Sequence, residues 1–452
     1  MKSSDYQAAL QYLYSFVDYE KLPGAAPPVR TLNLVTGLLE KLGNPESRWP
    51  SVHVTGTKGK GSTATMIANI AAESGYRVGL YTSPHLLSYR ERMVINGRKI
   101  PKGVFCELVE KARPVLDTYL RDSAEPPSFF DVWTALAFVY FAESQVDLAV
   151  VEVGLGGRLD STNVLMPDAA VITPIGLDHT DRLGSTIREI AIEKAGIVKQ
   201  SVPTISAPQV VEAQSVILDT CQSLDSRLIQ VGTDIQFSRE GTHSSGQVFS
   251  VNDSRSEYRN LVLGLRGAYQ IENAVTAIAT VEALNEGRIS IAPKAVGRAL
   301  KDVNMPGRLQ VIQQNPTILM DGAHNTLAIR TLVQSLDDLY PHRRVIFVLS
   351  LNQDKDVDGM CRILSAAGDE FIVANRRIVH KRQVNPETVA TRLRLSGKPV
   401  AVTEGVAEAL DLSRAKAGVK DLVCVTGSLY LVGEMLEIFH DMEPEETFSR
   451  DI

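Results

Sequence analysis

A stretch rich in glycine and lysine, "HVTGTKGKGST" from His53 to Thr63, is the first segment whose residue types and spacing could do chemistry. It follows a short β-branched run and precedes a pattern that predicts a helix from about Ser62 to Ser74. A strand, a glycine turn and a helix in this order direct backbone N–H groups and a helix N-terminus at one point, where an anion is stabilised. Lys60 would add a mobile positive charge. The stretch therefore indicates a phosphate-binding loop.

The match to the P-loop pattern G-x-x-x-x-G-K-[ST] is partial. Val54 stands where the first glycine belongs, and Gly61 separates Lys60 from Ser62. A glycine-rich turn that binds nothing is the alternative, so residues elsewhere in the chain have to decide.

Carboxylate and imidazole groups follow two further strand candidates. "LAVVEVGLGG" carries Glu152, and "AVITPIGLDHTD" carries Asp178 and His179. Ligands of open parallel sheets gather beyond the carboxyl ends of the strands, so these groups should lie near the glycine loop. A carboxylate in an apolar run costs several kcal/mol unless it is compensated, and a magnesium ion would compensate Glu152. An ion pair with Arg158 or Lys60 is the alternative, and His179 could be an ordinary loop histidine.

Other polar groups follow strand candidates with weaker signals. Ser83 in "YTSPHL" is expected at the same rim, whereas the Glu193–Lys194 pair in "IAIEKAGIVK" reads as a surface ion pair. Asp321 and His324 follow the run "TILM", and Arg308 precedes it in "MPGRLQ". Arg308 could reach a phosphate from a hinge between domains; an interface salt bridge for Arg308 and a helix N-cap at Asp321 or Asn325 are the alternatives.

The elements that must position these residues follow an alternating βα pattern, which predicts an α/β fold with parallel sheets. At 452 residues the chain is long enough for two domains. We predict an N-terminal P-loop-type ATPase domain over 1–304 and a C-terminal Rossmann-like domain over 305–452. Helices are expected at about 105–120 and 131–143, and the Ser- and Gly-rich region 232–265 should be an antiparallel excursion of the first domain.

Composition excludes several classes of protein. A formal net charge of -6 gives no basic field for a nucleic-acid backbone. The start lacks a signal-peptide pattern and no apolar stretch reaches the ~18 residues of a membrane span, so we expect a cytoplasmic protein. Four scattered cysteines without CxxC spacing should be buried free thiols. A monomer without nucleic-acid or membrane partners is the default expectation.

Taken together, the motifs resemble one family. "GTKGKGS", "GLYTSPHL", "VEVGLGGRLDSTN", "LDHTDRLG", "IAIEKAGI", "GAYQIENA", "PGRLQ", "MDGAHN" and "TGSLYLVGE" occur in an order and spacing similar to those of folylpolyglutamate synthases, including the bacterial enzymes that are also dihydrofolate synthases, within the Mur ligase superfamily. The resemblance covers nearly the whole chain. It implies an ATP-dependent ligase that adds L-glutamate to a folate, and also to dihydropteroate in bifunctional members, through an acyl phosphate, in a cleft between two domains.

The resemblance also implies roles for single residues. The ATP contacts would be Thr57, Lys58, Gly59, Lys60, Gly61, Ser62, Asn273, Arg308, Asp321 and His324. Magnesium, expected as two ions, would be held by Ser83, Glu152 and His179, and Lys194 would be carbamoylated. The catalytic set would be Lys60, Lys194, His179 and Arg308. Pteroate would contact Ser128, Arg158, Leu159 and Asp160.

Three positions depart from the common family pattern without removing a phosphate or metal group. Lys58 replaces an asparagine usual in bacterial members, Asp131 replaces a glutamate, and Tyr269 replaces a frequent histidine. The pteroate loop, expected around Asp18 to Arg30, is too variable for contacts to be assigned.

Two rivals remain at this point. A Mur enzyme of cell-wall synthesis would carry a separate uridine-nucleotide domain, but only about 50 residues precede the glycine loop, too few for a typical domain. A P-loop switch protein would hydrolyse ATP without any acceptor amine.

Overall fold

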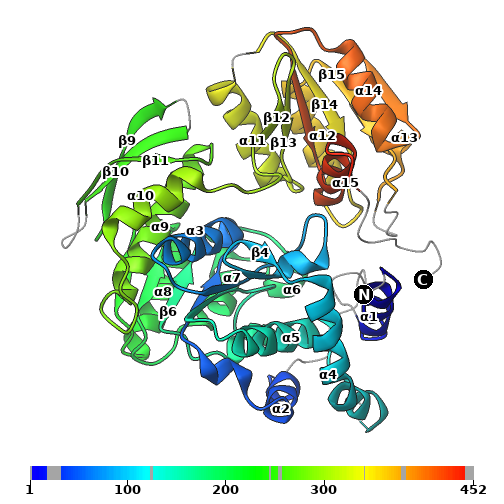
Figure 1. Ribbon diagram of the computed structural model, residues 1–452. Coiled ribbons are helices and arrows are strands. Elements are labelled where there is room, and N and C mark those ends of the chain that lie inside the picture. Colours follow the sequence, from blue (N-terminus) through cyan, green and yellow to red (C-terminus); the bar gives the residue numbers. More distant parts are fainter. Residues whose placement is uncertain are drawn as a thin grey trace. The chain divides into compact units, whose positions relative to one another are not determined.

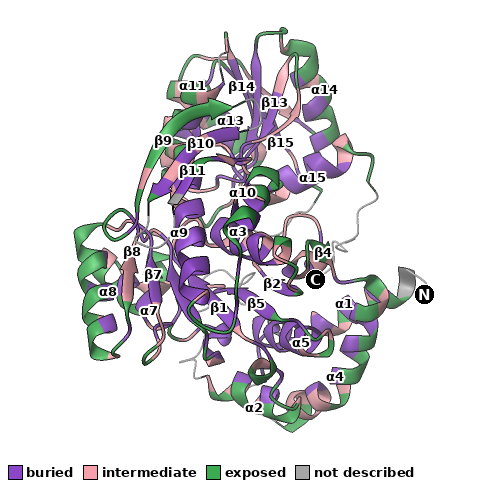
Figure 2. Cartoon of the chain, turned by 60° about the vertical axis from the view of Figure 1, so that its left-hand side comes forward, coloured by how far each residue is buried: buried purple, intermediate pink, exposed green. Residues whose placement is uncertain are grey.

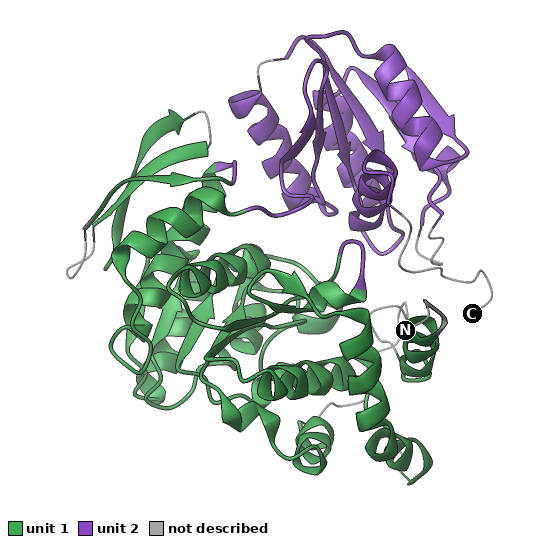
Figure 3. Cartoon of the chain, viewed as in Figure 1, with its two compact units in different colours: residues 1–85, 89–264, 268–303 green, residues 86–88, 265–267, 304–452 purple. Residues whose placement is uncertain are grey.

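The computed structural model describes residues 3–17, 32–122, 126–243, 246–252, 257–340, 342–377 and 383–442. The expected pteroate loop from Asp18 to Arg30 lies outside these residues. The chain divides into two compact units, coloured separately in Figure 3. Unit 1 comprises residues 1–85, 89–264 and 268–303, and unit 2 comprises 86–88, 265–267 and 304–452.

Unit 1 is built on an eight-stranded sheet with the order β4-β3-β2-β5-β1-β6-β7-β8. Figure 1 labels β4 and β6 of this sheet. Its strands are β1 (Ser51–Thr55), β2 (Val78–Tyr81), β3 (Met93–Ile95), β4 (Arg98–Lys99), β5 (Leu148–Glu152), β6 (Ala169–Ile172), β7 (Thr204–Ser206) and β8 (Leu228–Gln230). The strands from β2 to β8 in this order are parallel, and β3 and β4 form an antiparallel edge.

The helices of unit 1 connect and cover these strands. They are α1 (Ser3–Leu13), α2 (Asn33–Lys41), η1 (Pro45–Arg48), α3 (Lys60–Glu73), η2 (Tyr89–Arg92), α4 (Lys102–Asp122), α5 (Phe129–Glu143), η3 (Ser161–Val164), α6 (Thr180–Leu183), α7 (Ile187–Ala195), α8 (Val211–Ser223), α9 (Ala268–Leu284) and α10 (Pro293–Asp302). Every residue of β1, β5 and β6 is buried, as expected for parallel strands with helices on both faces (Figure 2).

The expected antiparallel excursion is confirmed. Strands β9 (Gln236–His243), β10 (Gly246–Asn252) and β11 (Glu257–Leu263) form a three-stranded antiparallel sheet with β10 in the middle. β9 is exposed along nearly its whole length and appears green in Figure 2.

Unit 2 contains a six-stranded sheet with the order β12-β13-β17-β14-β15-β16. Its elements are β12 (Gln310–Gln313), β13 (Thr317–Met320), α11 (Thr326–Leu339), β14 (Val345–Leu349), α12 (Val357–Ala367), β15 (Glu370–Ala374), α13 (Pro386–Arg394), β16 (Val400–Thr403), α14 (Val406–Lys416), β17 (Leu422–Thr426) and α15 (Leu429–Phe439). Strands β13 to β17 are parallel, as a Rossmann-like domain requires, and β12 adds an antiparallel edge that the sequence did not indicate.

Local chemistry sets the helix boundaries. α5 begins two residues before the predicted start because Ser128 caps it: its hydroxyl accepts from the Asp131 amide, and the Asp131 carboxylate accepts from the Ser128 amide. Thr186 and Glu189 form the same reciprocal cap on α7. All four cysteines are buried free thiols, as predicted. Within the described part of the chain, no helix combines the length and the apolar character that crossing a membrane requires.

Candidate functional site

The glycine loop joins β1 to α3 as the sequence predicts. Gly59 is the N-cap of α3 and has a φ of 82°, a left-handed conformation that favours glycine. Helix α3 begins at Lys60, two residues earlier than expected, so the amides of the "KGS" segment form its first turn. The first amides of a helix have no partner within the helix, which makes this turn a ready anion site.

The start of the loop is anchored to the segment after β6. Thr57 donates its amide to the Pro174 carbonyl at 3.0 Å, and its hydroxyl lies 3.0 Å from both the carbonyl oxygen and the amide nitrogen of Gly176. Gly56 is equally constrained, because a Cβ at this position would lie 1.9 Å from the Thr173 hydroxyl oxygen. The loop is therefore held in one shape by its neighbours.

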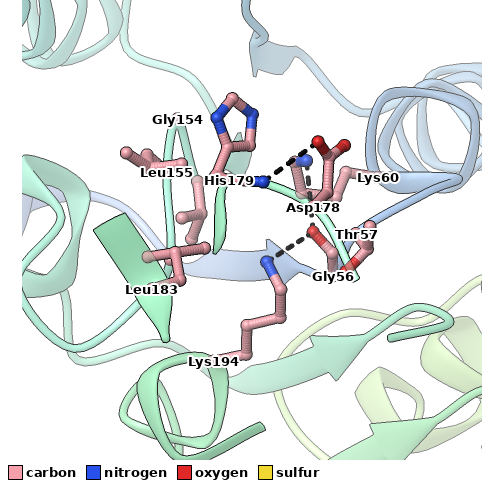
Figure 4. A pocket seen from close by; sticks show the side chains of 11 residues that line it. Gly56, Thr57, Lys60, Gly154, Leu155, Asp178, His179, Leu183 and Lys194 are labelled. Carbon is pink, nitrogen blue, oxygen red and sulfur yellow. Dashed lines mark hydrogen bonds between the residues drawn. The ribbon is translucent and has the colours of Figure 1, made fainter. Parts of the chain in front are cut away.

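Two lysines converge on one carbonyl of this loop (Figure 4). Lys60 Nζ donates to the Gly56 oxygen at 3.2 Å, and Lys194 Nζ donates to the same oxygen at 2.8 Å. Burial, and then the charge of Lys60, lower the pKa of Lys194 to about 7. The expectation of a surface Glu193–Lys194 pair is wrong, since Lys194 is only 4% exposed and Glu193 pairs with Arg158 instead.

A cavity of about 40 Å³ lies against this pair of lysines. Its lining includes Lys60, Asp178, His179 and Lys194, and it brings together the ends of β1, β5 and β6. His179 has a φ of 50° and is exposed, and its amide donates to the Asp178 carboxylate at 3.0 Å. The cavity combines ammonium groups with a carboxylate and an imidazole, a set suited to phosphates and their counterions.

Glu152 lies at the end of β5, beside the start of α3. It is 4% exposed, and its Oε2 accepts the Ser83 amide at 3.1 Å. A Cβ on Gly61 would lie 3.4 Å from the same oxygen, so the start of α3 is in van der Waals range of the carboxylate. The structure therefore brings Ser83, Glu152 and the phosphate loop together. The alternative pairing of Glu152 with Arg158 is wrong, because Arg158 pairs with Glu193.

The residues present fit a magnesium ion only if the nucleotide contributes. Within the described ranges, no group of three His, Cys, Asp or Glu side chains could hold a metal. Magnesium, however, is usually held by one or two carboxylates together with phosphate oxygens and water. Glu152 and Ser83 would supply the hard oxygen donors for such a site, next to the predicted phosphate position.

Two further predicted ATP contacts lie near the loop. Asn273, buried on α9, packs against Gly59: a Cβ there would lie 2.3 Å from its Oδ1. Its Nδ2 donates to Gln270 at 3.0 Å. Burial lowers the pKa of Lys58 to about 8, against the opposing charge of Asp178, so this lysine is a cation only partly withdrawn from water.

Three of the four positions implied for pteroate already make hydrogen bonds or an ion pair in unit 1. Ser128 is the N-cap of α5. Arg158 is half exposed and binds Glu193 at 2.7 Å, and Leu159 is partly buried. Asp160 is buried and accepts the amides of Leu155 at 2.9 Å and Thr162 at 3.0 Å. A contact with pteroate remains a prediction for all four.

The remaining predicted contacts lie in unit 2, around the end of β13. Asp321 is buried; it accepts the amides of Leu309 and Ala323, both at 2.9 Å. Burial raises the pKa of Asp321, and the charge of Arg308 opposes this. His324 Nδ1 lies 2.8 Å from the Gly322 oxygen. Asn325 is the N-cap of α11, as one alternative reading predicted.

Sequence reasoning missed the backbone part of this site. Two parts of it carry no side-chain signal. One is the Gly56 carbonyl, which accepts from both lysines, and the other is the segment from Val153 to Gly156, which lines the cavity. The glycines in "VGLGG" were the available hint, because a segment so poor in side chains allows close approach to a ligand.

Comparisons with known proteins show which family this chain is similar to. Residues 54–281 match the Mur ligase middle domain, and residues 307–429 match the glutamate ligase domain of Mur ligases. The dihydrofolate synthase/folylpolyglutamate synthase of Bacillus subtilis is 32% identical over 95% of this chain and 98% of its own length. The folylpolyglutamate synthase of Lacticaseibacillus casei is 32% identical over 94% and 97%, respectively.

The chain belongs to the folylpolyglutamate synthase/dihydrofolate synthase family. Solved structures agree with this membership. Mycobacterium tuberculosis folylpolyglutamate synthase complexed with ADP is 31% identical, covers 98% of this chain and 99% of its own, and has a TM-score of 0.88. Escherichia coli FolC in complex with DHPP and ADP is 30% identical, covers 96% and 98%, and has a TM-score of 0.81. The family resemblance and the α/β fold predicted from the sequence are thereby confirmed.

Proposed function

We propose that this protein is an ATP-dependent ligase that joins L-glutamate to a folate, and also to dihydropteroate, through an acyl phosphate. The observation that carries the proposal is the meeting of Lys60, Lys194, Asp178 and His179 around one cavity beside a helix N-terminus. Membership of a ligase family supports it. So do the relatives' ligands: ADP in the M. tuberculosis structure, AMPPCP in another folylpolyglutamate synthase structure, and DHPP with ADP in FolC.

The two domains would have different roles in the reaction. We assign ATP binding to residues 1–304 and the Rossmann-like ligase domain to 305–452, in line with the middle-domain and glutamate-ligase-domain matches at 54–281 and 307–429. Arg308, Asp321 and His324 are proposed nucleotide contacts from the second domain. We also propose that the protein is a cytoplasmic monomer, as expected from the sequence.

The reaction is a matter of making a carboxylate reactive toward an amine. The acceptor carboxylate attacks the γ-phosphorus of ATP, ADP leaves, and the resulting acyl phosphate exposes a carbonyl with a good leaving group. The glutamate amine then adds to that carbonyl, loses a proton, and phosphate departs from the tetrahedral intermediate. The protein contributes mainly position and charge. Lys60 and the first-turn amides of α3 would hold the β- and γ-phosphates, and Arg308 would balance the charge that develops.

Magnesium is part of this proposal. Ser83, Glu152 and His179 would hold it, as two ions, with phosphate oxygens completing the shell. When bound, it would neutralise phosphate charge during transfer. Glu152 also fixes the amide of Ser83, so the two donors stay adjacent before any ion binds.

Lys194 is proposed to carry a carbamate. With a pKa near 7, a large share of Lys194 is a neutral amine at neutral pH. Such an amine attacks the carbon of carbon dioxide, forms an N–C bond and releases a proton, which leaves a negatively charged carbamate. That charge would lie beside Lys60. Labelled ¹³C-bicarbonate should give a carbamate NMR signal that disappears in Lys194→Met.

The acceptor would bind against Ser128 and the segment from Arg158 to Asp160. This segment connects the cavity-lining residue Leu155, through Asp160, to the buried start of η3. Through its bond to Leu155 the segment lies beside the cavity where the phosphates are predicted, and a reacting carboxylate must be held close to them.

The test is an assay of ADP release with magnesium and L-glutamate, once with dihydropteroate and once with tetrahydrofolate, with mass spectrometry of the products. We expect ADP release that requires both acceptor and glutamate, and a product one glutamate residue heavier. ATP hydrolysis unaffected by either compound would instead support a P-loop switch protein, and turnover only with another acid and amine would support a different Mur-type ligase.

A further inference from the structure

His53 and Thr55 both reach from β1 to the segment that follows β5. Because they are two residues apart on one strand, their side chains point to the same face of the sheet. The Thr55 hydroxyl donates to the Gly156 carbonyl at 2.6 Å, and His53 Nε2 lies 2.8 Å from the Thr162 hydroxyl oxygen. The strand that leads into the phosphate loop is therefore bonded to both ends of the segment from Gly156 to Thr162.

The direction of the His53 bond follows from its neighbours. The Thr162 hydroxyl donates its only proton to the Asp160 carboxylate, so it can only accept from His53. Nε2 must therefore carry the ring proton, and Nδ1 must be bare. Among the described residues the buried Nδ1 has no hydrogen-bond partner, which agrees with this tautomer.

His53 is also held neutral. It is 0% exposed in the centre of the sheet, between β5 and β6. Burial, and then the charge of Lys199, lower its pKa to about 3. A group that never gains a proton near neutral pH serves here as a fixed hydrogen-bond donor.

Further hydrogen bonds connect Thr162 to the proposed acceptor segment. Thr162 donates to Oδ1 of Asp160, and Oδ2 of Asp160 accepts the amide of Leu155 at 2.9 Å. From the other side, the Arg158 amide donates to the Glu193 carbonyl at 2.7 Å, next to Lys194. The segment from Arg158 to Asp160 thus lies between the strand of the phosphate loop and the helix of Lys194.

We propose that His53 is a positioning residue whose Nε2–H, through Thr162, holds the segment from Arg158 to Asp160 in the shape that receives the pteroate or folate acceptor. This inference rests on the proposed function, because it takes that segment as the acceptor site. His53 itself touches no substrate. Its role is to fix the acceptor segment relative to the phosphate loop.

Two amide substitutions provide a matched test. His53→Gln places its amide nitrogen where Nε2 lies and keeps the donor, whereas His53→Asn places it near Nδ1, where the described part of the chain offers no acceptor. We expect His53→Asn to raise KM for the acceptor about three- to tenfold, the effect of one lost neutral hydrogen bond, with KM for ATP unchanged. His53→Gln should restore acceptor KM to within about twofold of the original protein.

Several outcomes would overturn the proposal. Equal acceptor KM in His53→Asn and the original protein would do so, as would a parallel rise of KM for ATP and acceptor, which indicates a general structural role. If the original protein consumes no folate or pteroate, the proposed function fails instead. ¹⁵N NMR of labelled histidine decides independently of activity: we expect Nε2–H with no titration between about pH 5 and 9. An Nδ1–H tautomer would contradict the inference.

Discussion

Replacing Gly59 with alanine should damage the phosphate loop through two separate effects. The φ of 82° places an alanine in the left-handed region, which costs roughly 1–2 kcal/mol. The new Cβ would also lie 2.3 Å from Asn273 Oδ1, so the buried Asn273 side chain must move and risks its 3.0 Å bond to Gln270, worth about 1 kcal/mol. We expect a total loss of about 2–3 kcal/mol in the free energy of unfolding.

The other end of the same helix offers a matched control. Gly75, just after α3, has a φ of 95° but open space around the position of a Cβ. Gly75→Ala should therefore lower the free energy of unfolding only by the cost of the left-handed backbone, about 1–2 kcal/mol, and leave ATP affinity unchanged. Urea unfolding would measure stability, and calorimetric titration with a non-hydrolysable ATP analogue would measure affinity.

Gly59→Ala should also weaken binding of the analogue at least about tenfold, because the loop amides no longer converge. Equal stability and equal analogue affinity in the Gly59→Ala and Gly75→Ala proteins would refute the reasoning.

Three other predictions concern groups of the site. Lys60→Ala and Glu152→Gln should each nearly abolish glutamate-dependent ADP release while circular dichroism stays unchanged; normal turnover in either would rule out the assigned roles. Burial lowers the pKa of Lys194 to about 7. Between about pH 7 and pH 10 the unfolded chain therefore binds more protons than the folded protein, and the free energy of unfolding should rise with pH. In urea unfolding without carbon dioxide, Lys194→Met should show a smaller rise, because Lys58, whose pKa is also lowered, still contributes; an unchanged slope would contradict the low pKa of Lys194. Ser128→Ala should lower the free energy of unfolding by about 1 kcal/mol through loss of the α5 cap, whereas no loss would show that the cap contributes nothing.

Elements with strong local patterns could be predicted from the sequence. The runs "VIFVL" and "LVCVT" became the buried strands β14 and β17, because continuous apolar runs suit parallel strands covered on both faces. The glycine loop was recognisable because it needs special backbone geometry at Gly59. Edge strands were harder: β12 has four partly buried residues and no apolar run.

The site was predictable as a set of strand ends but not as a set of contacts. Lys194 looked like a surface residue because its helix neighbours suggested a pair with Glu193, and local spacing does not show which face tertiary packing buries. The shared Gly56 carbonyl and the unprotonated Nδ1 of His53 depend on segments more than 100 residues apart in the chain. Such contacts come from sheet order, which hydrophobic periodicity does not specify.

A crystal structure with a non-hydrolysable ATP analogue and manganese in place of magnesium would test the central claim most directly. We predict that the terminal phosphates lie at the first turn of α3 and contact Lys60. The anomalous signal should show manganese bound to Glu152 and Ser83. Triphosphate or metal bound away from these strand ends, with Lys60 still donating only to Gly56, would contradict it.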